Sequence, residues 1–484
     1  MNLSDILRNH ARRRPEHPAV VSRDRQISYS EFDRGVDTVA RFLAEAGIRQ
    51  GDIVGVALKD TPEHMAVLFG IARIGAIILP VDRRWTAGEK KRTIEHFQAS
   101  LILIDEGDTI PQGNVPTRML GLSLFDGPNV KNQVVEAAGS NLPLVLSLSS
   151  GTTGQPKGPL LTHENFFARF LIYYVSLTLN EHDRFACSSP LYFSGSRGFS
   201  MCIIYAGATL VLLPPPVSPA VLIREINDYR CTSAFIVPTM LRRLMSEREE
   251  DTPCFPDMRV LISTGSALFA DDREKALRKV SANILNFYGS AEGGGVSVLG
   301  PGHAPEERTS AGAIVFGSNV RIVDEDYNEV PRGVIGRISY KSGGTATSFF
   351  NDPEASKTAF RDGWYLPGDL GYVSQRGFVF ITGREKDLII RAGVNIYPNE
   401  IESALLSHPE IDEAAVVGMP SEELGEEILA FVVSDREFSQ SELREHCAKH
   451  LASYKIPKLF RFITDVPRTS VGKIDKNRLS ASLT

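Results

Sequence analysis

The sequence has few of the features that mark secreted or nucleic-acid-binding proteins. Its five cysteines are odd in number, scattered and without a C-x-x-C pair, so neither a disulfide framework nor a zinc site is expected. The 53 lysines and arginines are outnumbered by 59 aspartates and glutamates, and this net charge of −6 argues against a nucleic-acid surface. The opening stretch MNLSDILRNHARRRPEHP has charges where a signal peptide needs an apolar core. We therefore expect a cytoplasmic protein with reduced thiols.

Long apolar runs are also missing. The most apolar stretch, AVLFGIARIGAIILPV, is interrupted by Arg73 and is shorter than a membrane span requires. The apolar fraction of 42% and the charged fraction of 23% are ordinary for a globular protein. A chain of 484 residues exceeds what one hydrophobic core usually serves, so we expect two or more domains and no membrane span.

What is present is an alternation of helical and strand patterns. Apolar residues recur at helical spacing over 28–47 and 62–75, and short buried-strand patterns occupy 52–58, 76–81 and 99–105. The same rhythm returns between 209 and 265, which predicts an α/β fold with a largely parallel sheet. From about residue 310 the pattern changes to antiparallel strands at 319–330 and 333–344. The segment 399–451 reads helix, strand, strand, helix, which is typical of a small α+β domain.

The stretch SLSSGTTGQPKG, residues 147–158, has the ingredients of a phosphate-binding loop. Its glycines let backbone N–H groups turn toward an anion, its hydroxyl side chains can donate, and Lys157 adds a positive charge. It is not the P-loop of NTPases, in which glycine precedes the lysine and Ser or Thr follows, because Pro156 and Gly158 flank Lys157 here. The composition alone favours a plain surface turn, since Gly- and Ser-rich clusters are usually loops.

Five landmarks in register point to one family. They are SSGTTGQPKG, NFYGSAEGG, WYLPGDLG, GREKDLIIRAGVNIYPNEIE and PRTSVGKI, in this order. With them the chain resembles the adenylate-forming superfamily of acyl-CoA synthetases, peptide-synthetase adenylation domains and luciferases, over nearly its whole length. The resemblance implies that a carboxylate attacks the α-phosphate of ATP to give an acyl-adenylate and pyrophosphate, after which a thiol takes the acyl group and AMP leaves.

The resemblance also implies the architecture. A large N-terminal adenylation domain, residues 1–383, would combine α/β sheets with a β-barrel-like subdomain. A hinge at 384–387, which includes Lys386, would join it to a small, mobile α+β lid at 388–484. In isolation Lys386 would be interpreted as an exposed loop lysine. Gly393, on the lid, would border the arm of coenzyme A, although a hairpin glycine would look the same.

Most nucleotide contacts are assigned by the resemblance. The glycine-rich loop would hold the β- and γ-phosphates, Tyr288 would stack on adenine, and Glu292 would bind Mg²⁺. Asp369 would accept both ribose hydroxyls with Arg384 beside it, although Gly-Asp turns and surface salt bridges are common. The full set of expected ATP contacts is Ser149, Thr152, Thr153, Gly154, Lys157, Gly265, Ser266, Ala267, Tyr288, Gly289, Ser290, Asp369 and Arg384.

Two residues are expected to act on the reacting groups. Lys473, in PRTSVGKI, would bridge the substrate carboxylate and the α-phosphate and stabilise the charge that develops there. Glu292 would act through Mg²⁺. The family usually has Thr directly before this glutamate, where this chain has Ala291, so one hydroxyl donor to the α-phosphate is missing. Ser290 is a candidate replacement.

The acid pocket is expected at SPLYFSGSRGFS. The resemblance implies that members which adenylate amino acids hold the α-ammonium group with an aspartate in this region. No acidic residue occurs between Ser188 and Ser200 here, which disfavours an α-amino acid. Arg197 would pair either with a second carboxylate or polar group on the substrate or with a structural acid. The glycines at 293–295 would leave room at the pocket wall. The expected substrate contacts are Tyr192, Phe193, Ser194, Arg197, Val237, Gly293 and Gly294, and aryl, fatty and dicarboxylic acids all stay open.

Coenzyme A is the expected acceptor, because the small domain resembles that of acyl-CoA synthetases. Transfer to an amine or a carrier protein would use the same first step and stays open. A non-catalytic nucleotide-binding protein is the alternative from a different class, which Ala291 favours and the other site residues oppose. The expected small-molecule partners are therefore ATP, Mg²⁺, a carboxylic acid and coenzyme A, and a homodimer is left open.

Overall fold

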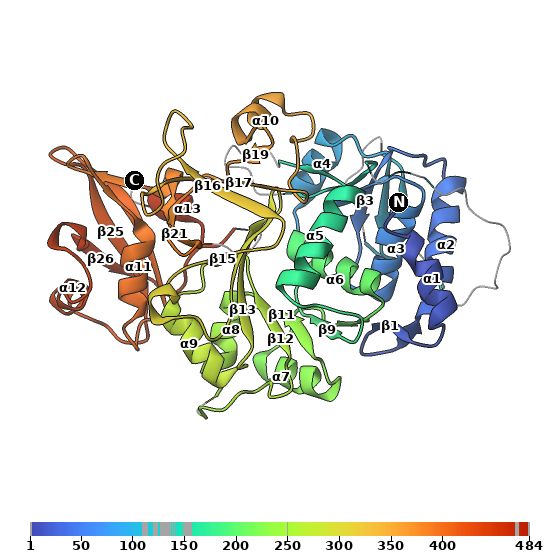
Figure 1. The fold of residues 1–484 in the computed structure, drawn as a ribbon, viewed down its shortest axis with the longest axis horizontal. Coiled ribbons are helices and arrows are strands. Elements are labelled where there is room, and N and C mark those ends of the chain that lie inside the picture. Colours follow the sequence, from blue (N-terminus) through green and yellow to red (C-terminus); the bar gives the residue numbers. More distant parts are fainter. Residues whose placement is uncertain are drawn as a thin grey trace.

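The computed structural model describes residues 2–108, 115–119, 124–125, 137, 139, 141–148, 157–248, 250–469 and 474–482. Three β-sheets organise these residues (Figure 1). Two belong to the part of the chain before residue 385 and the third to the part after it. The predicted α/β fold with a separate C-terminal sheet is confirmed.

The first sheet has the strand order β6-β5-β3-β4-β7-β8. All its neighbours pair in parallel except β7 and β8. It is built from β3 (Ile53–Ala57), β4 (Ile77–Pro80), β5 (Leu101–Ile104), β6 (Thr117–Met119), β7 (Pro143–Leu146) and β8 (Leu160–Thr162). The helices of this region are α1 (Asp5–Arg13), α2 (Tyr29–Glu45), α3 (Pro62–Arg73), α4 (Ala87–His96) and α5 (His163–Ser176).

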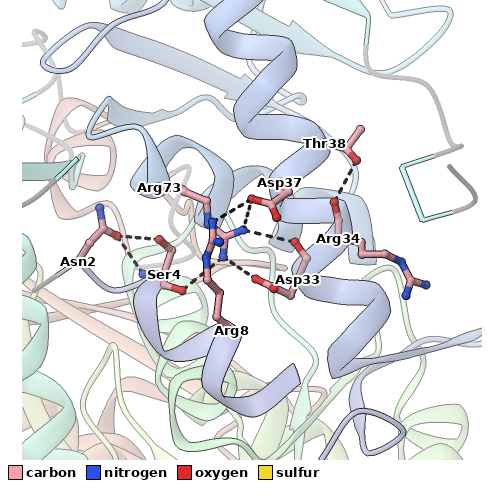
Figure 2. A network of polar contacts seen from close by, with 8 residues as sticks. All are labelled: Asn2, Ser4, Arg8, Asp33, Arg34, Asp37, Thr38 and Arg73. Carbon is pink, nitrogen blue, oxygen red and sulfur yellow. Dashed lines mark hydrogen bonds and ion pairs between the residues drawn. The ribbon is translucent and has the colours of Figure 1, made fainter. Parts of the chain in front are cut away.

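Arg73, which interrupts the most apolar run of the sequence, is the last residue of α3 and is fully buried. Its guanidinium donates to Asp33 at 2.6 Å and to Asp37 at 2.8 Å, both on α2 (Figure 2). Arg8 on α1 reaches Asp37 as well. Because Arg73 on α3 and Arg8 on α1 both bind Asp37 on α2, these side chains link the three helices. None of the helices in the described part of the chain combines the length and the apolar character needed to cross a membrane.

The second sheet begins as a parallel sheet with the order β2-β1-β10-β9-β11-β12-β13, in which β1 and β2 alone form an antiparallel pair. Its strands are β1 (Pro18–Val21), β2 (Gln26–Ser28), β9 (Arg184–Cys187), β10 (Thr209–Leu212), β11 (Ser233–Phe235), β12 (Val260–Ser263) and β13 (Ile284–Ser290). The helices between them are α6 (Ser194–Ala206), α7 (Pro219–Asp228), α8 (Pro238–Ser246) and α9 (Ala270–Lys279).

The same sheet continues beyond β13 with antiparallel strands. They are β14 (Gly294–Leu299), β15 (Gly312–Ile314), β16 (Ser318–Val323), β17 (Gly336–Ser342), β18 (Phe360–Arg361), β19 (Trp364–Tyr365), β20 (Asp369–Val373) and β21 (Phe378–Arg384), with α10 (Pro353–Ala359) and the short 3₁₀ helices Pro305–Glu307 and Glu385–Asp387. The sequence places the change near 310, but the pairing already reverses at the β13–β14 hairpin. The turn at 291–293 reverses the direction of the chain, and it contains Glu292, the residue predicted to bind Mg²⁺.

The third sheet has the order β23-β22-β25-β24, with β26 against β25. Its elements are β22 (Ile389–Arg391), β23 (Val394–Ile396), α11 (Pro398–Leu406), β24 (Glu413–Ser421), β25 (Gly425–Val433), α12 (Gln440–Ala448), the 3₁₀ helix Ser453–Lys455, β26 (Leu459–Phe462) and α13 (Lys476–Ala481). The helix–strand–strand–helix prediction for 399–451 is confirmed. These elements enclose their own apolar core and lie at one end of the molecule (Figure 1).

Candidate active site

Asp369 stands at the centre of a polar corner between three strands. It begins β20 and lies opposite Arg384, the last residue of β21. Arg384 Nε donates to Asp369 Oδ1 at 3.1 Å, and the Tyr288 hydroxyl from β13 donates to Asp369 Oδ2 at 2.6 Å. Each carboxylate oxygen thus has one protein donor and keeps acceptor capacity for a ligand hydroxyl. The predicted nucleoside residues Tyr288, Asp369 and Arg384 do meet in space.

The electrostatics of this corner keep the Tyr288 hydroxyl protonated. Burial raises its pKa well above the ordinary value, and the charge of Asp369 raises it further. A neutral phenol donates to the carboxylate, so Tyr288 stays fixed beside Asp369 with its ring available as an apolar surface. The Arg384 side chain is 46% exposed, so its contact with Asp369 is a partly exposed ion pair, and the two interpretations of Arg384, ribose contact and surface salt bridge, both stay open.

Glu292 lies in the turn between β13 and β14 and is 8% exposed. Its main-chain carbonyl accepts from the Ala346 N–H at 2.8 Å and from Arg169 Nη2 at 3.3 Å. Its side-chain carboxylate has no hydrogen bond or ion pair to any residue that the structure describes. Because a buried carboxylate without a partner is costly, this group suits a cation.

Neighbouring Ser290 is held inside the turn. Its Oγ accepts from the Gly293 N–H at 2.9 Å and contacts the Tyr340 hydroxyl at 2.9 Å. Ser290 therefore caps the turn, and its assignment to the α-phosphate stays a prediction.

The expectation that the glycines at 293–295 leave room at the pocket wall is wrong. A Cβ at Gly293 would collide with the Tyr340 ring, and one at Gly295 would lie 2.6 Å from the Phe287 ring. Gly294 has a φ of +77° and packs against Arg169. Protein side chains fill this space, so the glycines serve the tight packing of the turn.

Lys157 is the only one of the predicted phosphate-loop contacts within the described residues. Its Nζ lies 5.4 Å from the centre of the Phe349 ring. It also lines a cavity of about 540 Å³ that reaches Gly368, directly before Asp369, and Glu385. Ser149, Thr152, Thr153 and Gly154 lie outside the described residues, as does Lys473.

The segment 265–267 follows β12 and is exposed. Gly265 has a φ of +102°, a conformation that favours glycine, and its Cβ position would be 4.0 Å from Val237. Val237, a predicted substrate contact, and Gly265, a predicted ATP contact, are therefore neighbours. Gly289 pairs with Gly295 in the β13–β14 hairpin, where a side chain would meet the Gly294 carbonyl.

The predicted acid wall, Tyr192 to Ser194, leads into α6. The Tyr192 and Phe193 rings lie 4.0 Å apart between centres. Arg84 donates to the Tyr192 hydroxyl at 3.1 Å, and Asp60 accepts from the Leu191 N–H at 2.8 Å. No acid occurs between 188 and 200, but the fold brings an acid from elsewhere to this wall: Asp60, in the loop before α3.

Arg197 is 1% exposed. Its Nη1 donates to the carbonyls of Leu191 and Tyr192, and its Nη2 reaches Ser147 Oγ at 3.4 Å. Nε is buried without a partner, and no salt bridge joins Arg197 to an acid among the described residues. Burial lowers its pKa to about 9, and the nearby Arg169 charge adds to the effect. The structural ion pair that was one of its two interpretations is therefore absent from the described part of the chain.

On the C-terminal side, Gly393 occupies the β22–β23 hairpin turn with φ +78°, after Ala392 with φ +51°. Both values suit a two-residue hairpin turn, in which positive φ angles favour glycine, so the turn geometry by itself explains a glycine at this position. Lys386 lies in the short 3₁₀ helix between the second and third sheets and is largely exposed. The proposed hinge 384–387 thus occupies the link between the sheets.

Comparison with known proteins identifies the family. The family model described as "AMP-binding enzyme" matches residues 7–350, and the model described as "AMP-binding enzyme C-terminal domain" matches residues 400–473. The chain therefore belongs to the AMP-binding enzyme family, as the five landmarks predicted.

Individual relatives match over nearly the whole chain. A 2-succinylbenzoate–CoA ligase from Bacillus licheniformis is 30% identical over 99% of this chain and 100% of its own length. A fatty acid–[acyl-carrier-protein] ligase from Streptomyces coeruleorubidus is 30% identical over 97% of this chain and 94% of its own. The crystal structure of ATP-bound MatB from Rhodopseudomonas palustris superposes with a TM-score of 0.91 at 27% identity, over 100% of this chain and 99% of that one. The chain is thus an AMP-forming acid–thiol ligase of the acyl-CoA synthetase type.

Proposed function

We propose that this enzyme joins a carboxylic acid to coenzyme A in two steps, using the residues described above. In the first step a carboxylate oxygen attacks the α-phosphorus of ATP, the bond to the β-phosphate breaks, and pyrophosphate leaves. In the second step the thiol sulfur attacks the acyl carbon and AMP leaves. The observation that supports this most is the Tyr288–Asp369–Arg384 corner beside the unpaired Glu292 carboxylate.

In this proposal the chain's own residues bind and orient the reactants. Asp369 accepts the ribose hydroxyls, while Arg384 and Tyr288 hold the carboxylate in place. Lys157 and the loop before it hold the phosphates, and Lys473 stabilises the charge that develops during attack on the α-phosphate.

Glu292 is the residue we assign to Mg²⁺. Among the described residues no group of three or more His, Cys, Asp or Glu side chains is arranged to hold a metal ion by itself. A single carboxylate fits a cation that arrives with the phosphates of ATP, since Mg²⁺ is commonly held by one or two carboxylates plus substrate oxygens. Bound there, Mg²⁺ would neutralise phosphate charge.

The acid substrate we propose to test first carries a second anionic group. Arg197 supports this choice, because its buried guanidinium has no acidic partner among the described residues and an unused Nε–H. A buried charge of this kind gains most from an anion. One of the relatives described above is a ligase for 2-succinylbenzoate, a dicarboxylic acid, and another is a ligase for fatty acids, so a monocarboxylic acid is the competing outcome.

Coenzyme A is the acceptor we favour, and Gly393 and the hinge at Lys386 would serve the second step. An amine or a carrier protein is the alternative, and the carrier-protein ligase among the relatives supports keeping it.

We further propose a cytoplasmic location, in keeping with the five free, buried cysteines. Self-association into a homodimer is a separate proposal, which sedimentation would test.

The decisive experiment measures pyrophosphate release over a panel of mono- and dicarboxylic acids, with and without coenzyme A, using Lys473→Ala as the control variant. Release that needs both the acid and Lys473, with thioester formed only when coenzyme A is present, supports the proposal. Release without thioester would move the acceptor to an amine or a carrier protein. No release from any acid would contradict an active adenylation site.

A further inference from the structure

Arg169 is a buried arginine without an acidic partner in the described residues. It lies on α5 and is 5% exposed. Its Nε donates to the Gly344 carbonyl at 2.9 Å, and its Nη2 donates to the carbonyls of Ala291 at 2.9 Å and Glu292 at 3.3 Å. Within the described residues, the hydrogen bonds of the guanidinium therefore all go to main-chain oxygens. Two of these oxygens belong to residues 291–293, the turn that carries Glu292 and is called the acidic turn below.

Arg169 also binds the loop 343–346, through the Gly344 carbonyl, and this loop in turn contacts the acidic turn. In the 343–346 loop, the Ala346 N–H donates to the Glu292 carbonyl, and the Thr345 hydroxyl donates to the Gly293 carbonyl at 3.1 Å. Asn165, one helical turn before Arg169, donates to the Gly343 and Thr345 carbonyls. The backbone of Glu292 is thus fixed from α5 and from the loop, while no residue in the described ranges pairs with its carboxylate.

The local packing is built around an arginine. A Cβ at Gly344 would lie 2.7 Å from Arg169 Cγ, and a Cβ at Gly294 would lie 3.4 Å from Arg169 Nε. Two glycines therefore make the space through which the side chain passes. A lysine would put a single nitrogen at the end of a flexible chain and could not donate from a rigid fork to two loops at once.

We propose that Arg169 is a positioning residue that sets the direction of the Glu292 carboxylate toward the metal–nucleotide site. This inference rests on the proposed assignment of Glu292 to the cation that accompanies ATP. A carboxylate that binds a cation works only when the turn beneath it is rigid, and groups that orient a metal ligand typically affect metal affinity by tenfold or more.

The test measures binding, which does not depend on turnover. Isothermal titration gives the dissociation constant of ATP with excess Mg²⁺ and again with EDTA, without acid or coenzyme A. The ratio of the two constants is the gain in affinity that Mg²⁺ provides. The variants are Arg169→Lys, Arg169→Gln, Glu292→Gln and the double variant Arg169→Lys/Glu292→Gln. Thr345→Val, which removes one hydroxyl bond to the turn, is a milder probe of the same clamp.

Arg273→Lys is the matched control. Arg273 is also a buried arginine, 3% exposed, and it donates from α9 to the Gly300 carbonyl, outside the acidic turn. Its replacement should cost stability in a similar way without touching Glu292. Thermal denaturation of all variants shows whether the losses of stability are comparable.

We expect both Arg169 variants to lower the Mg²⁺ gain about tenfold, and Thr345→Val to lower it about threefold. Arg273→Lys should keep the wild-type gain. Glu292→Gln should remove the gain, and the Lys substitution should add nothing in that background. The inference is overturned if Glu292→Gln removes the gain while Arg169→Lys, Arg169→Gln and Thr345→Val leave it intact. If Glu292→Gln keeps the gain, the metal assignment itself fails. If the Arg169 variants do not fold, Thr345→Val decides.

Discussion

Arg384 faces Asp369 directly across the β20–β21 pair, and its Nε lies 3.1 Å from Asp369 Oδ1. The two residues are separated by a whole hairpin in the chain, yet the antiparallel register makes them partners. Because Tyr288 binds the other carboxylate oxygen, the corner is preorganised before any nucleotide arrives.

Replacement of Asp369 by Asn should weaken ATP binding strongly. The amide keeps one acceptor oxygen but loses the charge that holds Arg384, so we expect the KM for ATP to rise about tenfold or more. Tyr288→Phe removes only the hydroxyl that positions Asp369 and should raise KM about fivefold. Pyrophosphate-exchange kinetics measure both. An unchanged KM in Asp369→Asn would contradict the ribose assignment.

Arg197→Met should change the choice of acid more than the use of ATP. If the guanidinium binds a second anion, kcat/KM for dicarboxylic acids should fall about a hundredfold, whereas monocarboxylic acids should lose little. Competition assays with a matched pair of acids measure the ratio. Equal losses for both classes would show that Arg197 only supports the Leu191–Tyr192 wall, to whose carbonyls it donates.

Arg73→Met should destabilise the N-terminal region without altering the site. The substitution leaves Asp33 and Asp37 without the buried charge between them, which should lower the free energy of unfolding by about 3 kcal/mol. Lys91→Ala, which breaks the exposed pair with Glu95, is the control and should cost less than about 0.5 kcal/mol. Urea denaturation measures both. Equal losses would contradict the structural role of Arg73.

Asp60 should make stability depend on pH. Burial raises its pKa from 3.8 to about 6, so the folded protein binds this proton more tightly than the unfolded chain. The contribution of this tighter proton binding to the free energy of unfolding is fully present below pH 3.8 and is lost as pH rises through about 6. Asp60→Asn cannot ionise, so its free energy of unfolding should exceed that of the wild type by up to about 3 kcal/mol above that pH. Denaturation at several pH values measures the difference, and a constant offset would contradict the prediction.

The sequence predicted the parallel α/β region, the antiparallel strands and the C-terminal α+β unit, because alternating and helical spacing is a local property. The prediction that the glycines at 293–295 leave room at the pocket wall was wrong, because the side chains of Tyr340, Arg169 and Phe287 pack against them. No role was predicted for Arg169, although an arginine within the apolar stretch NFFARFLIYY was a signal that something polar had to receive it.

The sequence by itself identified the family and the reaction type, because the five landmarks are contiguous motifs that resemble those of a known enzyme family. It also predicted three residues, Tyr288, Asp369 and Arg384, that meet in one corner of the structure. The tertiary structure alone decided which distant groups support them. Arg169 and Ala291 are 122 positions apart, and Asp60 and Leu191 are 131 positions apart. No spacing rule links such pairs. They meet because buried carbonyls and N–H groups must find partners, and the packing of strands and helices determines which side chains can reach them.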